Sequence, residues 1–136
     1  MKTYLALAAL AASSLLACSS ARAAEAQKFK VIHVPDLVAE LQSGHPTVLD
    51  ANGEKTRNAD GIIPGAKLLS SCGSYDVAKE LPASKDSELV FYCANTKCMA
   101  SHSAAGRAVE AGYTNVAVLA DGIQGWKAAG QKTAKP

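Results

Sequence analysis

Apolar residues along the chain gather in five short runs, which polar or amphipathic segments separate. Each run is rich in Val, Ile, Leu or Phe, and turn residues such as Gly, Pro, Asn and Asp lie close to its ends. Short apolar runs bounded in this way predict buried β-strands. The predicted strands are Phe29–Val34, Thr47–Asp50, Lys67–Leu69, Glu88–Cys93 and Val116–Leu119.

Segments with helical spacing lie between these runs. Pro35 opens the first one, which places Leu37, Val38 and Leu41 on one face and ends at Gly44. Further helices are expected over 75–81, 101–111 and 123–129, whereas the polar segment 52–61 is expected to be a loop with one helical turn. Strands that alternate with helices predict an α/β fold, in which helices cover both faces of a parallel sheet.

Residues 1–24 have the pattern of an export signal. Lys2 supplies a positive start, an apolar run rich in Ala and Leu follows from Leu5 to Leu16, and small residues come next. The apolar run is too short to cross a membrane, and the order of the three zones disfavours a buried N-terminal helix. We therefore expect a signal and the start of a tether over 1–24, one domain over 28–131, and a flexible tail over 132–136.

Two sites could end this signal. Residues 15–18 (LLAC) resemble a bacterial lipobox, in which Cys18 would be lipidated and become the first residue, whereas residues 21–23 (ARA) suit an ordinary signal peptidase. The lipobox is favoured because a cysteine at the end of such an apolar run is otherwise unusual. By resemblance to bacterial lipoproteins, Ser19 after the cysteine favours the outer membrane. The expected location is the periplasm or the cell envelope, with a lipid anchor as the expected membrane contact.

Charge and cysteine content narrow the function classes. The 136-residue chain has 14 basic and 12 acidic residues, a net charge of +2, and no basic patch interleaved with aromatic residues, so nucleic acid is not an expected partner. Cys72, Cys93 and Cys98 lie beyond the signal and would meet an oxidising compartment after export. Because three is an odd number, at least one thiol should stay free or react transiently.

Cys93 is the strongest candidate for chemistry. It ends the best predicted strand and opens a loop that leads into a helix, and sites in parallel α/β folds lie at the carboxyl ends of strands. The N–H groups of such a loop and the helix N-terminus would lower the pKa of the thiol and cradle an anion beside it. The pattern favours a nucleophile that forms a covalent intermediate such as a persulfide. A buried structural cysteine at a strand end is the alternative.

Short sequence motifs before and after Cys93 follow one another along the chain in a specific order and spacing. They are VLD at 48–50, GIIPGA at 61–66, LVFYC at 89–93, Ala104-Ala105, AGY at 111–113, NV at 115–116, Leu119, DG at 121–122, Trp126 and Gly130. Together they resemble the rhodanese family of sulfurtransferases and their relatives from Lys30 to Gly130.

The resemblance implies an α/β fold around a five-stranded parallel sheet with helices on both faces. In catalytic members the loop cysteine, here Cys93, takes a sulfane sulfur from a small anionic donor such as thiosulfate and passes it to a thiol or cyanide. No cofactor and no metal are expected. The residues expected to bind the substrate are those of the loop and the helix start, namely Ala94, Asn95, Thr96, Lys97, Cys98, Met99, Ala100 and Ser101.

The loop departs from the family pattern. Cys98 stands where the family carries an arginine, and the spacing to Ala104-Ala105 is longer, which predicts a wider cradle over 94–100 with Ser101 opening the helix. The related C-x5-R phosphatases would place their arginine at Met99, so a phosphate clamp is missing. Lys97 could supply positive charge, but only as a point charge. Two further family residues, an arginine and a histidine with supporting roles, are replaced by Asn52 and Ile62.

Cys98 keeps other chemistries open. It could form a disulfide with Cys93 that makes the protein a thiol redox protein or sensor, or it could resolve a persulfide or sulfenate on Cys93. It could also be a loop residue without a role. Cys93, Cys98 and His102 offer only three metal ligands, which disfavours a metal site. The missing arginine leaves a non-catalytic rhodanese-like binding module as a further alternative.

Overall fold

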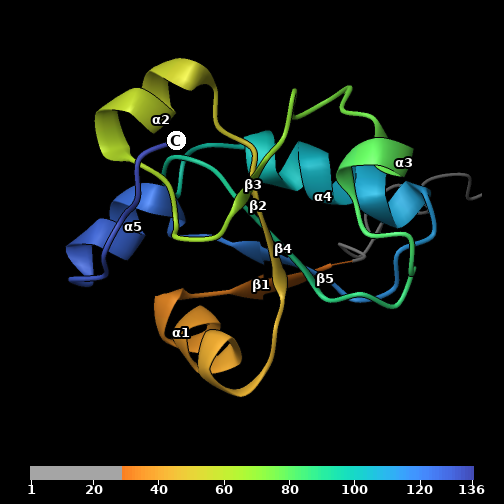
Figure 1. Ribbon diagram of the computed structural model, residues 1–136, viewed down its shortest axis with the longest axis horizontal. Coiled ribbons are helices and arrows are strands. Elements are labelled where there is room, and N and C mark those ends of the chain that lie inside the picture. Colours follow the sequence, from red (N-terminus) through yellow and green to blue (C-terminus); the bar gives the residue numbers. More distant parts are fainter. Residues whose placement is uncertain (1–28) are drawn as a thin grey trace, which may run out of the picture.

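Five parallel strands form one sheet in the order β1-β5-β4-β2-β3 (Figure 1). The structure is a computed structural model that describes residues 29–136, so the predicted export signal and the lipidation of Cys18 lie outside the described residues. The strands are β1 (Lys30–Ile32), β2 (Thr47–Asp50), β3 (Lys67–Leu68), β4 (Leu89–Tyr92) and β5 (Val116–Leu119). The predicted α/β fold with a five-stranded parallel sheet is therefore confirmed.

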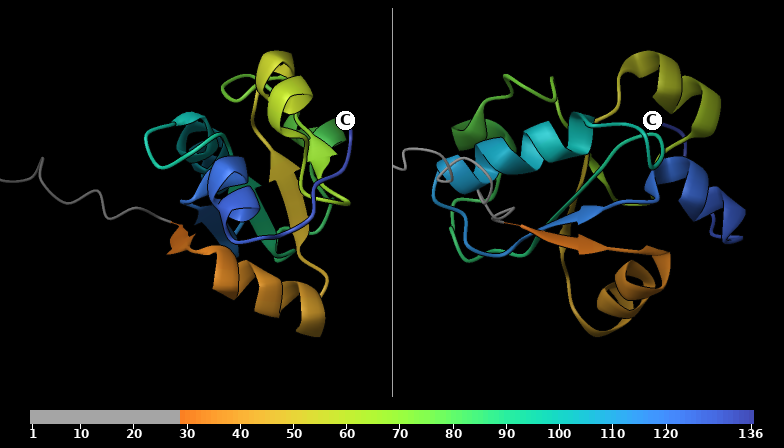
Figure 2. Two further views of the ribbon diagram at one scale, coloured as in Figure 1. Left: turned by 90° about the vertical axis from the view of Figure 1, so that its left-hand side faces the viewer. Right: turned by 180° about the vertical axis from the view of Figure 1, so that it is seen from behind.

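Five helices in the described part of the chain surround this sheet. They are α1 (Val34–Ser43), α2 (Glu54–Asp60), α3 (Val77–Glu80), α4 (Ala100–Glu110) and α5 (Gly122–Ala128). Figure 2 shows α1 and α4 on opposite sides of the sheet. Between residues 29 and 136, no helix combines the length and the apolar character that a membrane crossing requires.

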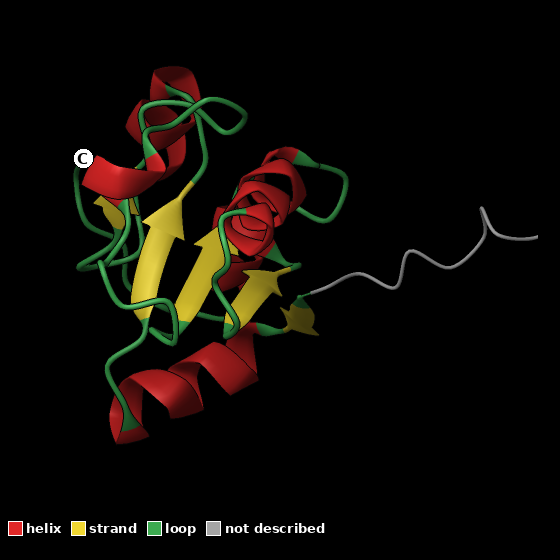
Figure 3. Ribbon diagram, turned by 90° about the vertical axis from the view of Figure 1, so that its right-hand side faces the viewer, coloured by secondary structure: helices red, strands yellow, loops and turns green. Residues whose placement is uncertain are grey.

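The core consists of two apolar layers, one on each face of the sheet. The alternation of side chains along β4 divides it: Leu89 and Phe91 join the layer beneath α4, whereas Val90 and Tyr92 join the layer against α1 and α5. All four side chains are fully buried, which explains why β4 reads as a continuous apolar run rather than an alternating one. Figure 3 shows the helices packed on both sides of the strands.

The helix α2 differs from the expected loop with one turn. It runs over Glu54–Asp60 and buries none of its residues, so no apolar periodicity announces it in the sequence. It is instead held by Arg57, whose guanidinium donates to the backbone oxygens of Asp50 and Leu69, each at 2.9 Å. Gly61 ends the helix with a φ of 76°, a conformation that favours glycine.

The helix α3 is shorter than the predicted 75–81. Tyr75 lies before it, fully buried, and its hydroxyl donates to the backbone oxygen of Ala104 at 2.8 Å. Asp76 then caps the helix by accepting from the N–H of Ala78 at 3.0 Å. The aromatic ring thus packs into the core from a loop rather than from a helix face.

The expected flexible tail over 132–136 is hydrogen-bonded to the domain. The N–H and C=O groups of Ala134 pair with those of Ile62 at 2.9 Å in both directions, as a single antiparallel bridge. The carbonyl oxygen of Lys132 accepts from the indole N–H of Trp126 at 2.8 Å. These contacts follow from the meeting of two distant segments, which the polar composition of the tail does not announce.

Candidate active site around Cys93 and Cys98

Cys93 follows the last residue of β4, at the edge of the sheet where the parallel strands end. β4 lies between β5 and β2, with Tyr92 opposite Leu119 on one side and Asp50 on the other. The loop from residue 94 to residue 99 connects Cys93 to α4, which begins at Ala100. The predicted strand–loop–helix position of Cys93 therefore matches the structure.

The start of α5 fixes the position of this loop. The backbone N–H groups of Ile123 and Gln124 donate to the carbonyl oxygens of Cys93 and Ala94, at 2.9 Å and 3.0 Å. Gly122 makes this approach possible, because a Cβ there would lie 2.6 Å from the carbonyl oxygen of Cys93. The backbone at Cys93 is thus held from the side of β5 as well as from β4.

The middle of the loop is a tight turn organised by Asn95. Its carbonyl oxygen accepts from the N–H of Cys98 at 3.0 Å, and its side-chain oxygen accepts from the N–H of Lys97 at 3.1 Å. Its amide nitrogen donates to Gln124 on α5 at 3.1 Å. The N–H groups of Lys97 and Cys98, which the sequence predicted as part of an anion cradle, are therefore bonded inside the turn. Asparagine is common in such turns because its side chain can accept from a backbone N–H two residues further on.

Cys93 is a buried thiol with polar neighbours. The residue is 2% exposed, and its sulfur lies 3.2 Å from both the carbonyl oxygen of Cys98 and the hydroxyl of Ser101. Burial raises the pKa of the Cys93 thiol, the neighbouring Cys98 raises it further, and the hydroxyl and N–H of Ser101 only partly offset this. The sequence-based prediction that the pKa of Cys93 is lowered is therefore wrong.

Cys98 has the opposite balance. It is partly exposed, and although burial acts to raise its pKa, hydrogen bonds from the Cys93 thiol and from the N–H groups of Ala94 and Ala100 outweigh burial and lower it. Ala100 begins α4, and the first N–H groups of a helix lack partners within it. The pKa values of these two neighbouring thiols are therefore shifted in opposite directions, upward for Cys93 and downward for Cys98.

Ser101 links the buried thiol to a histidine. It is 1% exposed, and its hydroxyl lies 3.2 Å from the Cys93 sulfur and 3.5 Å from Nδ1 of His102. The His102 ring in turn packs edge-on against Phe29, with ring centroids 5.7 Å apart. The Ser101 hydroxyl therefore lies between the Cys93 sulfur and the His102 ring.

The structure separates the predicted site residues into three groups. Ala94, Cys98, Ala100 and Ser101 contact one or both sulfurs, Asn95 shapes the turn, and Thr96, Lys97 and Met99 are exposed. Cys72 lies outside this group, packed against the core beneath α4. Among residues 29–136, no three His, Cys, Asp or Glu side chains are grouped as metal ligands would be.

A buried polar network beneath the site was not predicted from the sequence. Asp50 is fully buried and accepts hydrogen bonds from the N–H of Asn52 at 2.7 Å, from Arg57 at 3.3 Å and from the Tyr92 hydroxyl. Burial, and then the carboxylate, raise the pKa of Tyr92, whose hydroxyl accepts from the N–H of Ile63 at 3.1 Å. The network ties β2, β4 and α2 together just before Cys93. An acid at the end of a buried strand was its only signal in the sequence.

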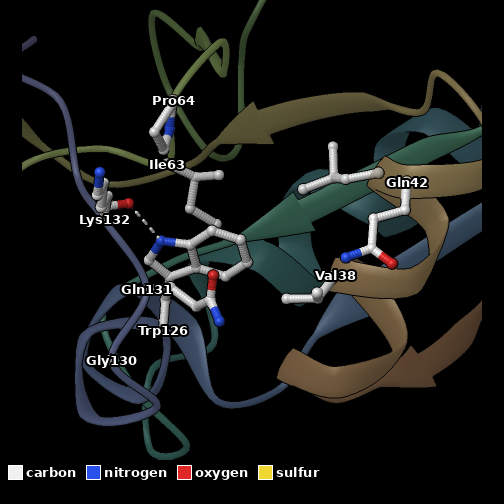
Figure 4. Close-up of a pocket in the computed structure, with 9 residues that line it drawn as sticks. Val38, Gln42, Ile63, Pro64, Trp126, Gly130, Gln131 and Lys132 are labelled. Atoms are coloured by element: carbon white, nitrogen blue, oxygen red, sulfur yellow. Dashed lines mark hydrogen bonds between the residues drawn. The ribbon is translucent and has the colours of Figure 1, made fainter.

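A separate apolar pocket of about 440 Å³ lies between α1 and the segment after α5. Figure 4 shows Trp126 at its centre, with Ile63 on one side and Val38 of α1 on the other. Trp126 is 4% exposed and belongs to the core layer against α1, so it packs α5 on the sheet. Of the cysteines in the described part of the chain, Cys72, Cys93 and Cys98, none lines this pocket.

The comparisons with known proteins agree with this architecture. A family model described as a rhodanese-like domain matches residues 33–129. The Alr3790 protein from Anabaena is 27% identical with a TM-score of 0.63, covering 76% of this chain and 80% of that one. The human single-domain sulfurtransferase TSTD1 is 25% identical with a TM-score of 0.58, covering 72% and 95%.

A third structure, the polysulfide-sulfur transferase homodimer from Wolinella succinogenes, is 18% identical with a TM-score of 0.65 and 80% coverage of both chains, a likeness in fold alone. No curated protein matches the sequence. The family match spans most of the chain, the sheet has five parallel strands as predicted, and the buried cysteine lies at the loop after β4. The chain therefore belongs to the rhodanese-like domain family.

Proposed function

We propose that the protein is a sulfurtransferase in which Cys93 carries a sulfane sulfur as a persulfide. The family match and the fold shared with the human sulfurtransferase support a role of this class. The observation that carries the proposal is the place of Cys93, buried at the end of β4 and within 3.2 Å of Ser101 on the first turn of α4. The helix N-terminus there favours negative charge, and a persulfide is an anion at neutral pH.

The proposed reaction has two halves. A thiolate attacks the outer sulfur of thiosulfate, a sulfur–sulfur bond forms on the enzyme, and the bond to the sulfonate breaks with release of sulfite. An acceptor then attacks the outer sulfur of the enzyme persulfide and restores the thiolate. With cyanide the product is thiocyanate, and with a thiol it is the acceptor's persulfide. No net oxidation is required, because each half transfers one sulfur between two nucleophiles.

Mass spectrometry after incubation with thiosulfate tests this proposal. We expect one added sulfur on the peptide that contains Cys93, and thiocyanate formation that falls in Cys93→Ser. Cys72→Ser is the matched control, because Cys72 packs against the core beneath α4 and is not among the groups that shift the pKa of Cys93 or Cys98. An unmodified Cys93 together with unchanged turnover in Cys93→Ser would contradict the proposal. A Cys93→Ala variant with full biological activity would instead favour a non-catalytic binding module.

A thiol redox function is the second candidate, favoured by the contact between the two thiols. The Cys93 sulfur lies 3.2 Å from the backbone oxygen of Cys98, and each thiol shifts the pKa of the other, so the two cysteines are direct neighbours. Oxidised glutathione would supply the oxidant: two exchange steps form the Cys93–Cys98 bond and release two glutathione thiols. A peptide map after mild oxidation should then contain this disulfide. If the two thiols never pair, this candidate fails.

We further propose that the protein works outside the cytoplasm, in the periplasm or anchored to the cell envelope. The order of charged, apolar and small residues over 1–24 and the LLAC segment at 15–18 support this proposal. Cell fractionation of the wild type and of Cys18→Ala tests it. A lipid anchor predicts that only the wild type sediments with membranes, whereas a soluble exported form predicts no difference between the two. Wild-type protein in the cytoplasmic fraction would contradict export.

A further inference from the structure

The two thiols of the loop differ in access. Cys93 is 2% exposed, and its sulfur faces the carbonyl oxygen of Cys98 and the hydroxyl of Ser101. Cys98 is partly exposed in the same loop, between exposed Lys97 and exposed Met99. Attack on a sulfur–sulfur bond needs an open approach along the bond axis. In this structure a donor anion therefore reaches Cys98 before Cys93.

We propose that Cys98 is the thiol that takes the sulfur from the donor and then passes it inward to Cys93. This inference rests on the proposed sulfurtransferase function and assigns the entry point of that same site. It makes Cys98 a catalytic residue rather than a replacement for the family's arginine. The donor class is a small anion with a sulfane sulfur, such as thiosulfate.

The surroundings of Cys98 suit the first step. Burial acts to raise the pKa of Cys98, but the Cys93 thiol and then the N–H groups of Ala94 and Ala100 lower it, so a larger share of Cys98 than of Cys93 is thiolate at neutral pH. Its thiolate attacks the outer sulfur of thiosulfate, and sulfite leaves with the electron pair of the broken bond. The persulfide on Cys98 would then carry the negative charge that the two N–H groups and the start of α4 stabilise.

The second step moves the sulfur to the buried thiol. The Cys93 proton passes to the outer sulfur of the Cys98 persulfide, and the Cys93 thiolate attacks that same sulfur. A persulfide forms on Cys93, the bond to Cys98 breaks, and the Cys98 thiolate is restored. The direction follows from the two environments, since the thiol with the lower pKa is the better leaving group.

Trypsin makes the two sites separable by mass. It cleaves after Lys97, so Cys93 and Cys98 fall on different peptides, 86–97 and 98–107. The full chain is mixed with thiosulfate, quenched with an alkylating reagent at short intervals and digested. The wild type, Cys93→Ser, Cys98→Ser and the control Cys72→Ser are compared. Circular dichroism checks that each variant is folded. If Cys98→Ser does not fold, Cys98→Ala takes its place in the comparison.

Four results support the proposal. In the wild type the added sulfur appears first on peptide 98–107 and later on 86–97. In Cys93→Ser it stays on Cys98. In Cys98→Ser the loading of Cys93 slows by about tenfold or more at neutral pH, because the remaining thiol is less ionised and less accessible. The loading rate of that variant also recovers at higher pH, which a merely structural defect would not produce.

Other results overturn it. If Cys98→Ser loads Cys93 at the wild-type rate, sulfur enters at Cys93, and the proposed function stands without the transfer between thiols. If the wild type keeps its sulfur on Cys98 and never on Cys93, or forms a Cys93–Cys98 disulfide with release of sulfide, the second step is wrong. If the wild type loads neither cysteine, the proposed function itself fails.

Discussion

At the scale of the residue, the surroundings of each sulfur decide its chemistry. Cys93 and Cys98 share one loop, yet burial raises the pKa of Cys93, whereas hydrogen bonds from Cys93 and two backbone N–H groups lower that of Cys98. A cysteine at the end of a strand was predictable as the candidate nucleophile. The order of ionisation was not, because it depends on which sulfur the N–H groups face.

Ser101→Ala tests the neighbour of the buried thiol. The hydroxyl of Ser101 is one of the groups that lower the pKa of Cys93, so its loss should raise that pKa further. The pH profile of Cys93 alkylation, followed on peptide 86–97, should shift to higher pH, with a slower rate at neutral pH. Ser103→Ala is the matched control, because Ser103 is exposed on the same helix. An unchanged profile would show that the hydroxyl has no influence on the thiol.

At the scale of the element, short contacts between loops and helix starts position the site. The sequence predicts every strand and the helices α1, α4 and α5 within a few residues, because each carries an apolar face or ends at a glycine. It misses the extent of α2, which has no buried residue. The close approach of α5 to the loop at Cys93 also has no signal other than a glycine at 122.

Gly122→Ala should displace the loop. The residue has a φ of 63°, and a Cβ would lie 2.6 Å from the carbonyl oxygen of Cys93 and from the carbonyl carbon of Ala94. We expect the free energy of unfolding to fall by at least about 2 kcal/mol, together with a loss of sulfur loading. Gly106→Ala is the control, because open space surrounds that position on α4. Chemical denaturation measures both, and equal stability of the two variants would contradict this reading.

Tyr75 links the segment before α3 to α4 through its hydrogen bond to Ala104. Its ionisation should make the free energy of unfolding depend on pH. Burial raises the pKa of Tyr75 to about 12, whereas an unfolded chain releases this proton near pH 10. Between these values the unfolded state binds fewer protons than the folded state, so the free energy of unfolding falls as pH rises from about 10 to about 12. Denaturation across this range should show a steeper loss for the wild type than for Tyr75→Phe. Parallel curves would contradict the assignment.

At the scale of the whole molecule, a buried charge pair holds the strands that position Cys93. Asp50 has no exposed surface, and Arg57 binds both its side chain and its backbone oxygen while also reaching Leu69 after β3. The pair therefore joins β2, the end of β3 and α2, and the Tyr92 hydroxyl adds β4. Arg57, in the polar segment 52–61, thus has a structural role that the loop-like composition of this segment does not predict.

Arg57→Leu removes one partner of this pair. Because Asp50 would stay buried without its charged partner, we expect the free energy of unfolding to fall by about 3 kcal/mol or more. Lys127→Ala is the comparison, since its ion pair with Asp60 is partly exposed and should contribute about 1 kcal/mol or less. Thermal or urea unfolding gives both values. A small effect of Arg57→Leu would mean that water or Asn52 satisfies Asp50.

The sequence by itself determined the fold class, the order of the strands and helices along the chain, and the cysteine at the loop after β4. These features follow from local rules, since apolar periodicity and turn residues act over a few neighbouring positions. The tertiary structure alone decided that the N–H groups of Ala94 and Ala100 lower the pKa of Cys98. It also decided that the Ser101 hydroxyl lies between the Cys93 sulfur and the His102 ring. Burial and hydrogen bonding set the reactivity of a thiol, and both depend on groups that only the folded chain brings together.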